Sequence, residues 1–238
     1  MSFVLVYLRL YARCFALAFQ GIAKNAWTLV LPMGLGVAYL LLAVPLSALG
    51  PLAGIFLRLA LYFGFSSYLY FAAGTVANQK VDLSDLKKSF LAYFWSLMGL
   101  FFVLWIVEII LGAVLGQNPN RAVILRGVDL IAFIVLNPAP EIIYLKGTRG
   151  GTDTINRSVR FIQENWIEWF IPNGLIGYGA YLAVTRLSAL PTALAIVAAL
   201  FAGAAFHVVM VFRGHLFEAL DGSTHRQRMF KYGRKDAA

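Results

Sequence analysis

The chain has 238 residues, of which 61% are hydrophobic and 13% charged, and its mean hydropathy is +0.76. Soluble domains are about half apolar and about a quarter charged. The composition therefore excludes an ordinary soluble domain and predicts an integral membrane protein. The single cysteine, Cys14, excludes an intrachain disulfide and a cysteine metal cluster.

The segment from Phe3 to Lys24 is apolar except for a narrow basic and polar stripe. Helical spacing brings its four members onto one face: Arg9, Arg13, Gln20 and Lys24. Such a stripe is typical of helices that lie in the membrane interface. We expect residues 1–25 to form an amphipathic interfacial helix, and the alternative is that this segment begins the first span.

Six apolar segments follow that are long enough to cross a bilayer, since a spanning helix needs roughly 20 apolar residues. They are Ala26 to Leu49, Leu52 to Asn78, Phe90 to Leu115, Ala122 to Leu145, Trp166 to Thr185 and Pro191 to Phe212. We predict an all-α polytopic membrane protein with three parts: residues 1–25, a six-span domain at residues 26–213 and a basic cytoplasmic tail at residues 214–238. Within the tail, the polar stretch Thr224 to Lys235 is expected to be flexible.

Short capped helices are predicted before two of the spans. Asp82 is placed as the N-cap before the third span, and Thr152 or Asp153 as the cap of an amphipathic helix before the fifth. No repeat of fixed period stands out, because the two halves share little beyond these capped segments.

The net charge of +9 is explained by topology. With six spans both termini lie on one side, and placing them in the cytoplasm puts most of the 20 Lys and Arg residues inside. The exceptions are Arg58, Arg121, Arg126 and Arg186. Because no soluble basic surface with stacking groups is present, nucleic acid is excluded as a partner. The expected location is a bacterial inner membrane with both termini cytoplasmic.

The fourth span contains an interruption. Pro138 and Pro140 break its helical pattern, and Glu141 follows directly. Pro140 suits the first position of a short helix, and Glu141 would then lie in the positive first turn of that helix. The sequence predicts a broken fourth span.

Two further sets of intramembrane polar residues are candidates for function, because ionisable groups are costly in lipid. Arg58 and Glu108 both lie roughly 10–12 Å below the outer ends of their spans at about 1.5 Å per residue, so we predict an ion pair between them. Its role is either a structural clamp or transport. Glu141 and His207 could share a depth and relay protons or hold a cation, or each could be structural.

The sixth span carries small residues at every fourth position. Ala195, Ala199 and Gly203 form a stripe that suits close helix packing, and His207 continues it.

Enzyme signatures are absent from the sequence: there is no nucleophile elbow, no zinc-protease motif and no phosphate loop. We therefore expect no catalytic residue, no cofactor and no metal.

Several short motifs resemble those of a known group of bacterial six-span proteins. The motifs are Ile22-Ala23-Lys24-Asn25, Leu83-Ser84-Asp85-Leu86 with Phe90, Pro138-Ala139-Pro140-Glu141, Asn156-Arg157-Ser158 and Asn165-Trp166. Together they resemble the membrane domain of glycerophosphodiester phosphodiesterases and related families of unknown function. The phosphodiesterase domain of that family is absent here, so the resemblance implies a membrane-embedded accessory role and transfers no catalytic residue.

Two functions follow from these features. The favoured one is a non-enzymatic membrane scaffold or accessory subunit that contacts anionic lipid headgroups at the cytoplasmic face and partner helices, from either a second copy or another membrane protein. The alternative is a small-solute or ion transporter or channel that uses the broken fourth span with Arg58, Glu108, Glu141 and His207.

Overall fold

The computed structural model describes residues 3–187 and 191–233, and these residues form helices and turns with no strand among them. The long helices are α1 (Phe3–Lys24), α2 (Leu31–Leu46), α3 (Ala53–Val76), α5 (Phe94–Leu115), α6 (Arg121–Val135), α8 (Gly151–Leu187) and α9 (Thr192–Asp221). The shorter ones are η1 (Ala26–Val30), η2 (Ser47–Leu52), η3 (Leu83–Asp85), α4 (Leu86–Ala92), α7 (Ala139–Glu141), the π-helical turn η4 (Ile142–Lys146) and α10 (His225–Gly233).

Several helical stretches are long and apolar enough to cross a membrane. Within the described residues these are Val4–Lys24, Ala26–Val76, Leu83–Leu115 and Ile196–Asp221, with a fifth if α6 and the α7–η4 segment, which meet at a 46° bend, count as one. The stretch Ala26–Val76 is a helical hairpin, because Gly50 turns the chain with a φ of 57°. The second half of α8, which carries Glu168 and Asn173, is not among these stretches.

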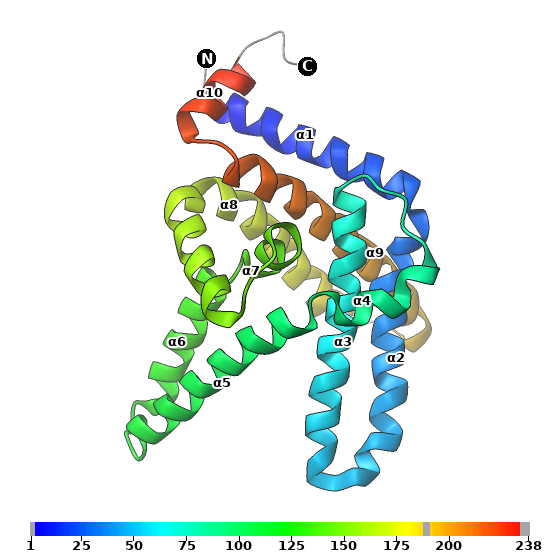
Figure 1. Ribbon diagram of the computed structural model, residues 1–238, viewed down its shortest axis with the longest axis vertical. Helices are drawn as coiled ribbons and strands as arrows, with labels where there is room; N and C mark the ends of the chain where they lie inside the picture. Colours follow the sequence, from blue (N-terminus) through cyan, green and yellow to red (C-terminus); the bar gives the residue numbers. More distant parts are fainter. Residues whose placement is uncertain (1–2, 188–190, 234–238) are drawn as a thin grey trace.

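The molecule divides into a packed head and diverging hairpins (Figure 1). The α2–α3 hairpin and the α5–α6 pair extend away from the head and separate toward their turns. Large apolar side chains on these outer helices are exposed, including Leu41, Val44, Ile110, Val123 and Phe133. A soluble protein rarely exposes apolar surface on this scale, so the fold supports a membrane-embedded protein.

The buried core lies in the head, where six segments converge. It contains α1, the last turns of α3, the first turns of α5, the α7–η4 segment, the first half of α8 and the second half of α9. Its largest fully buried apolar side chains are Leu10, Leu69, Phe71, Leu97, Ile142, Ile143, Trp169, Phe212, Leu216, Phe217 and Leu220. The interactions that hold the helices together are therefore concentrated at one end of the molecule.

The same backbone break recurs where each of three head helices meets the helix that follows it. Asn25 after α1 has φ −130° and ψ 42°, Tyr93 after α4 has −124° and 5°, and Asn165 inside α8 has −134° and 17°. Each break turns an amphipathic helix into an apolar one. In the described residues, the order of head helix, break and following helix thus occurs three times, and we call each occurrence a unit.

The first and third units also share details of sequence. In both, the side-chain amide of the Asn at the break donates to the carbonyl oxygen four residues before it, at 3.2 Å. Pro32 follows Asn25 by the same seven positions that separate Pro172 from Asn165. The three breaks have no fixed sequence period, since they are 68 and 72 residues apart. The repeat lies in backbone geometry and burial, with too few identities to stand out in the letters.

The segment predicted as a basic tail is largely ordered helix in the described residues. Helix α9 continues to Asp221 with Leu216, Phe217 and Leu220 buried, and α10 packs against α1. The expectation of flexibility for residues 224–235 is corrected in their described part, because residues 225–233 form α10, in which Arg228 and Tyr232 are buried against the head.

Candidate functional site

Glu141 lies at the centre of the head and has no exposed surface. Helix α6 ends at Val135, and Asn137 and Pro138 turn the chain into the three-residue helix α7. Pro140 occupies the start of that helix and Glu141 its first turn, as the sequence predicts. The short helix therefore directs one carboxylate into the core.

The partner of Glu141 is Arg213 of α9. Arg213 Nε donates to Glu141 Oε1 at 2.7 Å, and its Nη2 donates to Oε2 at 3.0 Å and to the carbonyl oxygen of Asn137 at 2.6 Å. A two-point contact of this kind is the strongest form of a side-chain ion pair. It joins the turn before α7 to α9.

An aromatic ring completes this arrangement. The indole of Trp169 donates from Nε1 to Asn137 Oδ1 at 2.7 Å, and its ring lies 5.0 Å from the Arg213 guanidinium carbon. Trp169 is fully buried and comes from α8, beyond the Asn165 break. Elements from two of the repeated units therefore meet at one guanidinium.

Close helix packing holds α9 in place beside this pair. Gly214 follows Arg213, and a Cβ atom there would lie 2.5 Å from the Tyr144 hydroxyl oxygen and 2.6 Å from Val76 Cγ2. The Tyr144 hydroxyl donates to the Met210 carbonyl at 3.4 Å, and the Tyr93 hydroxyl donates to the Tyr144 carbonyl at 3.2 Å. Only glycine at position 214 lets α9 approach this closely.

His207 does not join Glu141. It is fully buried, and its Nε2 forms a 2.9 Å hydrogen bond with the hydroxyl of Thr28. In the described part of the chain its Nδ1 has no partner. Thr28 lies three residues beyond the Asn25 break, so His207 ties the sixth predicted span to the start of the first.

The small-residue stripe is only partly visible. A Cβ atom at Gly203 would lie 3.6 Å from Met33 Cβ, so this position faces α2 across ordinary van der Waals distance. Ala199 is half-buried. The side chain of Ala195 lies outside the described residues.

Arg58 and Glu108 are not brought together. Both are exposed on the diverging hairpins, and in the described residues neither forms an ion pair or hydrogen bond. The predicted intrachain ion pair is therefore not formed. Helices α3 and α5 separate with distance from the head (Figure 1). Counting residues along each helix predicts the depth of a side chain, but it does not predict the angle between the two helices.

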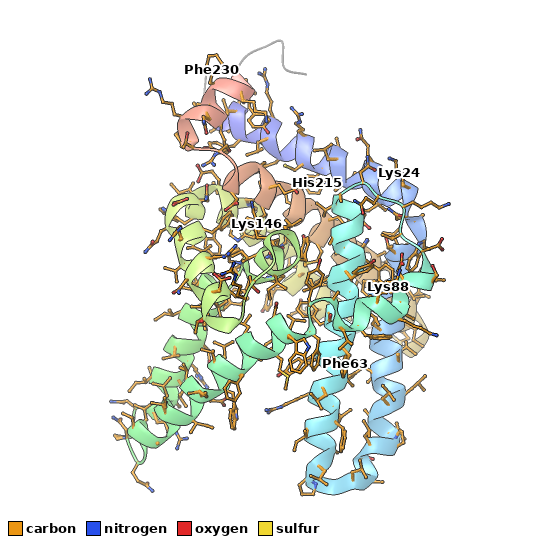
Figure 2. All side chains as sticks on the ribbon, viewed as in Figure 1. Lys24, Phe63, Lys88, Lys146, His215 and Phe230 are labelled. Carbon is orange, nitrogen blue, oxygen red and sulfur yellow. The ribbon has the colours of Figure 1, made fainter. Side chains whose placement is uncertain are left out.

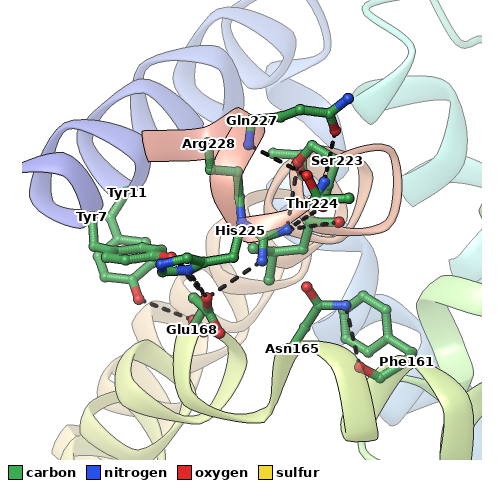
Figure 3. A network of polar contacts seen from close by, with 12 residues as sticks. Tyr7, Tyr11, Phe161, Asn165, Glu168, Ser223, Thr224, His225, Gln227 and Arg228 are labelled. Atoms are coloured by element: carbon green, nitrogen blue, oxygen red, sulfur yellow. Dashed lines mark hydrogen bonds and ion pairs between the residues drawn. The ribbon is translucent and has the colours of Figure 1, made fainter. Parts of the chain in front are cut away.

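A second polar network joins the two ends of the chain (Figure 3). Glu168 Oε1 accepts hydrogen bonds from the Tyr7 hydroxyl at 2.7 Å and from Arg228 Nη2 at 3.3 Å, and His225 Nδ1 lies 3.2 Å away. The Tyr11 hydroxyl donates to the Glu168 carbonyl at 3.0 Å. This network fixes α1 and α10 on α8.

A polar cleft of about 590 Å³ opens on the surface of the head beside Glu141's helix. It lies between η4, the first half of α8 and the end of α9, and Arg160 lines it without an ion partner among the described residues. Two other basic groups at its rim are paired, Lys146 with Asp221 at 2.6 Å and Arg157 with Asp153 at 2.9 Å.

Sequence reasoning missed Arg213, Trp169 and Arg228. The position of Arg213 directly after the sixth apolar segment predicts a cytoplasmic charge. The signal against this prediction is that apolar residues continue beyond it, at residues 216–220. Glu168 offered a signal, since it is the single acid in an otherwise apolar stretch.

The polar groups of the site are occupied by one another. Both oxygens of the Glu141 carboxylate are occupied by Arg213, and no group of three or more His, Cys, Asp or Glu side chains able to hold a metal occurs in the described residues. No family model, no curated protein and no solved structure matches the chain.

Proposed function

We propose that this chain is a non-enzymatic protein of a bacterial inner membrane that acts as a scaffold or accessory subunit through lipid headgroups and partner helices. The observation that carries the proposal is the state of its buried polar groups. Glu141 and His207 each have 0% exposure, and Glu141 is held by Arg213. A transporter or channel needs a water- or solute-filled path to such groups, whereas a scaffold uses them to fix helix geometry.

The membrane placement that we propose has six spans in three hairpins. They are α2 with α3, α5 with α6 and the bent α7–η4 segment, and the second half of α8 with α9, so that the fourth span is the broken one. Lys24 and Lys146 lie on the side away from the turns of the α2–α3 and α5–α6 hairpins (Figure 2). The positive-inside rule assigns that side, with both termini, to the cytoplasm.

The lipid contact that we propose is made by the head. Arg13, Gln20 and Lys24 are exposed and Arg9 is partly buried on one face of α1, and Val4, Leu8 and Phe19 are exposed on another. This division suits a helix at the interface, with its apolar strip among acyl chains and its basic strip among anionic headgroups. The polar cleft with Arg160 lies on the same head and offers a second basic surface.

The motif resemblance to the membrane domain of glycerophosphodiester phosphodiesterases supports an accessory role. A membrane domain that lacks the catalytic domain of that family would keep its lipid and helix contacts. We propose on this ground that the chain works beside another membrane or envelope protein.

The first test measures lipid recognition. Protein in phosphatidylcholine nanodiscs is compared with protein in discs that also contain phosphatidylglycerol, and the thermal midpoint should rise with the anionic lipid because a ligand of the native state stabilises it. Arg157→Gln/Arg160→Gln should lose most of this rise. Arg121→Gln/Arg126→Gln, on the opposite side, should keep it. An equal rise in both variants would contradict headgroup recognition by the cleft.

The second test addresses the transport alternative. Purified protein in liposomes should give no proton or potassium flux above empty liposomes, and Glu141→Ala should leave that baseline unchanged while lowering thermal stability. A flux that the wild type supports and Glu141→Ala abolishes would replace the scaffold with a transporter.

A further inference from the structure

Two opposite charges stand exposed at equal depth on the diverging hairpins. Arg58 lies eight residues after the turn at Gly50, and Glu108 lies eight residues before the turn at Gly116. At roughly 1.5 Å per residue both are about 12 Å from their turns. In the described part of the chain neither charge has a hydrogen-bond or ion-pair partner.

An unpaired charge at this depth is costly in a bilayer, so such residues face a partner or a water-filled space. Neither Arg58 nor Glu108 faces the interior of its own chain, because both are exposed. The surrounding surface is apolar, with Ile55 and Leu61 beside Arg58 and Trp105 beside Glu108. Each charge therefore lies in an apolar helix face that no described residue of the chain covers.

Open glycines accompany both charges. Gly54 lies one turn from Arg58 on the same face of α3, and a Cβ atom there would meet nothing within 4 Å. Gly112 lies one turn from Glu108 on the same face of α5, and a Cβ atom there would meet only the end of Arg121, at 3.7 Å. Small residues at such positions let another helix approach closely.

Other charges on α6 can neutralise each other. Arg126 and Asp129 are both exposed and are spaced i,i+3 on one helix, a spacing at which opposite charges interact. Arg126 is thus the intrachain rival for Glu108, but pairing it there would leave both Asp129 and Arg58 without a counter-charge. Matching Arg58 with Glu108 gives each of these four residues a counter-charge, whereas Arg121, at the start of α6, donates to the carbonyl oxygen of Gly116 at 3.4 Å.

We propose that the occupant of these faces is a second copy of this chain. A two-fold axis along the membrane normal keeps the depths of both copies equal, and it lets Arg58 of each copy pair with Glu108 of the other. The two ion pairs form together, and the glycines allow α3 of one copy to approach α5 of the next. This proposal rests on the membrane placement given under the proposed function.

Cysteine cross-linking tests the contact directly. In a Cys14→Ala background, Arg58→Cys and Glu108→Cys are expressed as separate tagged chains in one membrane and oxidised. The mixture should give a disulfide-linked dimer, while either variant alone should give at least about ten-fold less. Glu108→Cys with Arg126→Cys in one chain tests the intrachain rival: an intramolecular disulfide as efficient as the mixed dimer would overturn the assignment of Glu108 to Arg58.

Charge exchange tests the energetics. Arg58→Glu and Glu108→Arg should each lower the dimer fraction in detergent about ten-fold, because polar contacts between membrane helices are modest and each dimer loses two. The exchanged variant Arg58→Glu/Glu108→Arg should recover it to within about three-fold. A monomeric wild type, or an exchanged variant as dissociated as the single variants, would overturn the proposal.

A labelling control separates failure of the dimer from failure of the membrane placement. Arg58→Cys in intact vesicles should resist a membrane-impermeant maleimide from either side. Labelling of this cysteine with no cross-link would refute the placement, whereas protection with no cross-link would refute the dimer alone.

Discussion

Removing one member of the Glu141–Arg213 pair should destabilise the protein strongly. Glu141→Gln keeps the shape of the side chain but leaves the guanidinium of Arg213 in the core without its counter-charge. Breaking one side of a buried ion pair costs about 3–5 kcal/mol. For a chain of this size each kcal/mol lowers the thermal midpoint by roughly 2–4 °C, so we expect a fall of about 6–20 °C.

The assay is a double-mutant cycle on protein in nanodiscs, with the thermal midpoint followed by circular dichroism. Glu141→Gln, Arg213→Gln and the double variant are compared, and the double variant should be much less affected than the sum of the single ones because the contact is lost only once. The exposed pair of Asp153 and Arg157 is the matched control, since surface pairs contribute only about 0–1 kcal/mol.

Two results would refute this reasoning. One is a Glu141→Gln variant whose midpoint falls no further than that of Asp153→Asn. The other is strict additivity of Glu141→Gln and Arg213→Gln, which would mean that the two side chains do not interact in the folded protein.

Three further predictions follow from named contacts. Gly214→Ala should lower the free energy of unfolding by about 1–3 kcal/mol through overpacking. Gly177→Ala, where a Cβ atom would meet nothing within 4 Å, should be neutral or stabilising. Thermal midpoints of the two variants measure the difference. Glu168→Gln should release α10 from the head, because Arg228 loses its counter-charge. Limited trypsin digestion should then cut the C-terminal segment faster than in wild type, while cutting elsewhere at unchanged rates. The Arg149 backbone N–H and the Arg157 side chain lower the pKa of Asp153 below its ordinary value of 3.8. The contribution of Asp153 to folding stability is therefore present at neutral pH and is lost as pH falls through its folded-state pKa. The difference in thermal midpoint between wild type and Asp153→Asn should vanish below that pH.

Helical membrane class and local breaks could be predicted from the sequence because each depends on a short stretch. Apolar length identifies α2, α3, α5 and α9, and two prolines with a following acid identify the α7 start. These features depend on residue type and on neighbours in the sequence, so tertiary packing does not change them.

Partners across the fold could not be predicted, because they depend on the angles between helices. Glu141 meets Arg213 and His207 meets Thr28, although depth alone equally allowed Glu141 with His207. The repeated unit was also hidden, since Tyr93 occupies the break where the other two units have asparagine. Backbone geometry is shared there without identity of side chain.

The order in which the chain is synthesised gives the two buried networks a further meaning. Glu141 precedes Arg213 by 72 residues, Glu168 precedes Arg228 by 60, and Tyr7 precedes Glu168 by 161. Each carboxylate is therefore made long before its cation, and the head stays open until α9 and α10 emerge. A chain that stops short of Arg213 therefore leaves the carboxylate of Glu141 without its counter-charge.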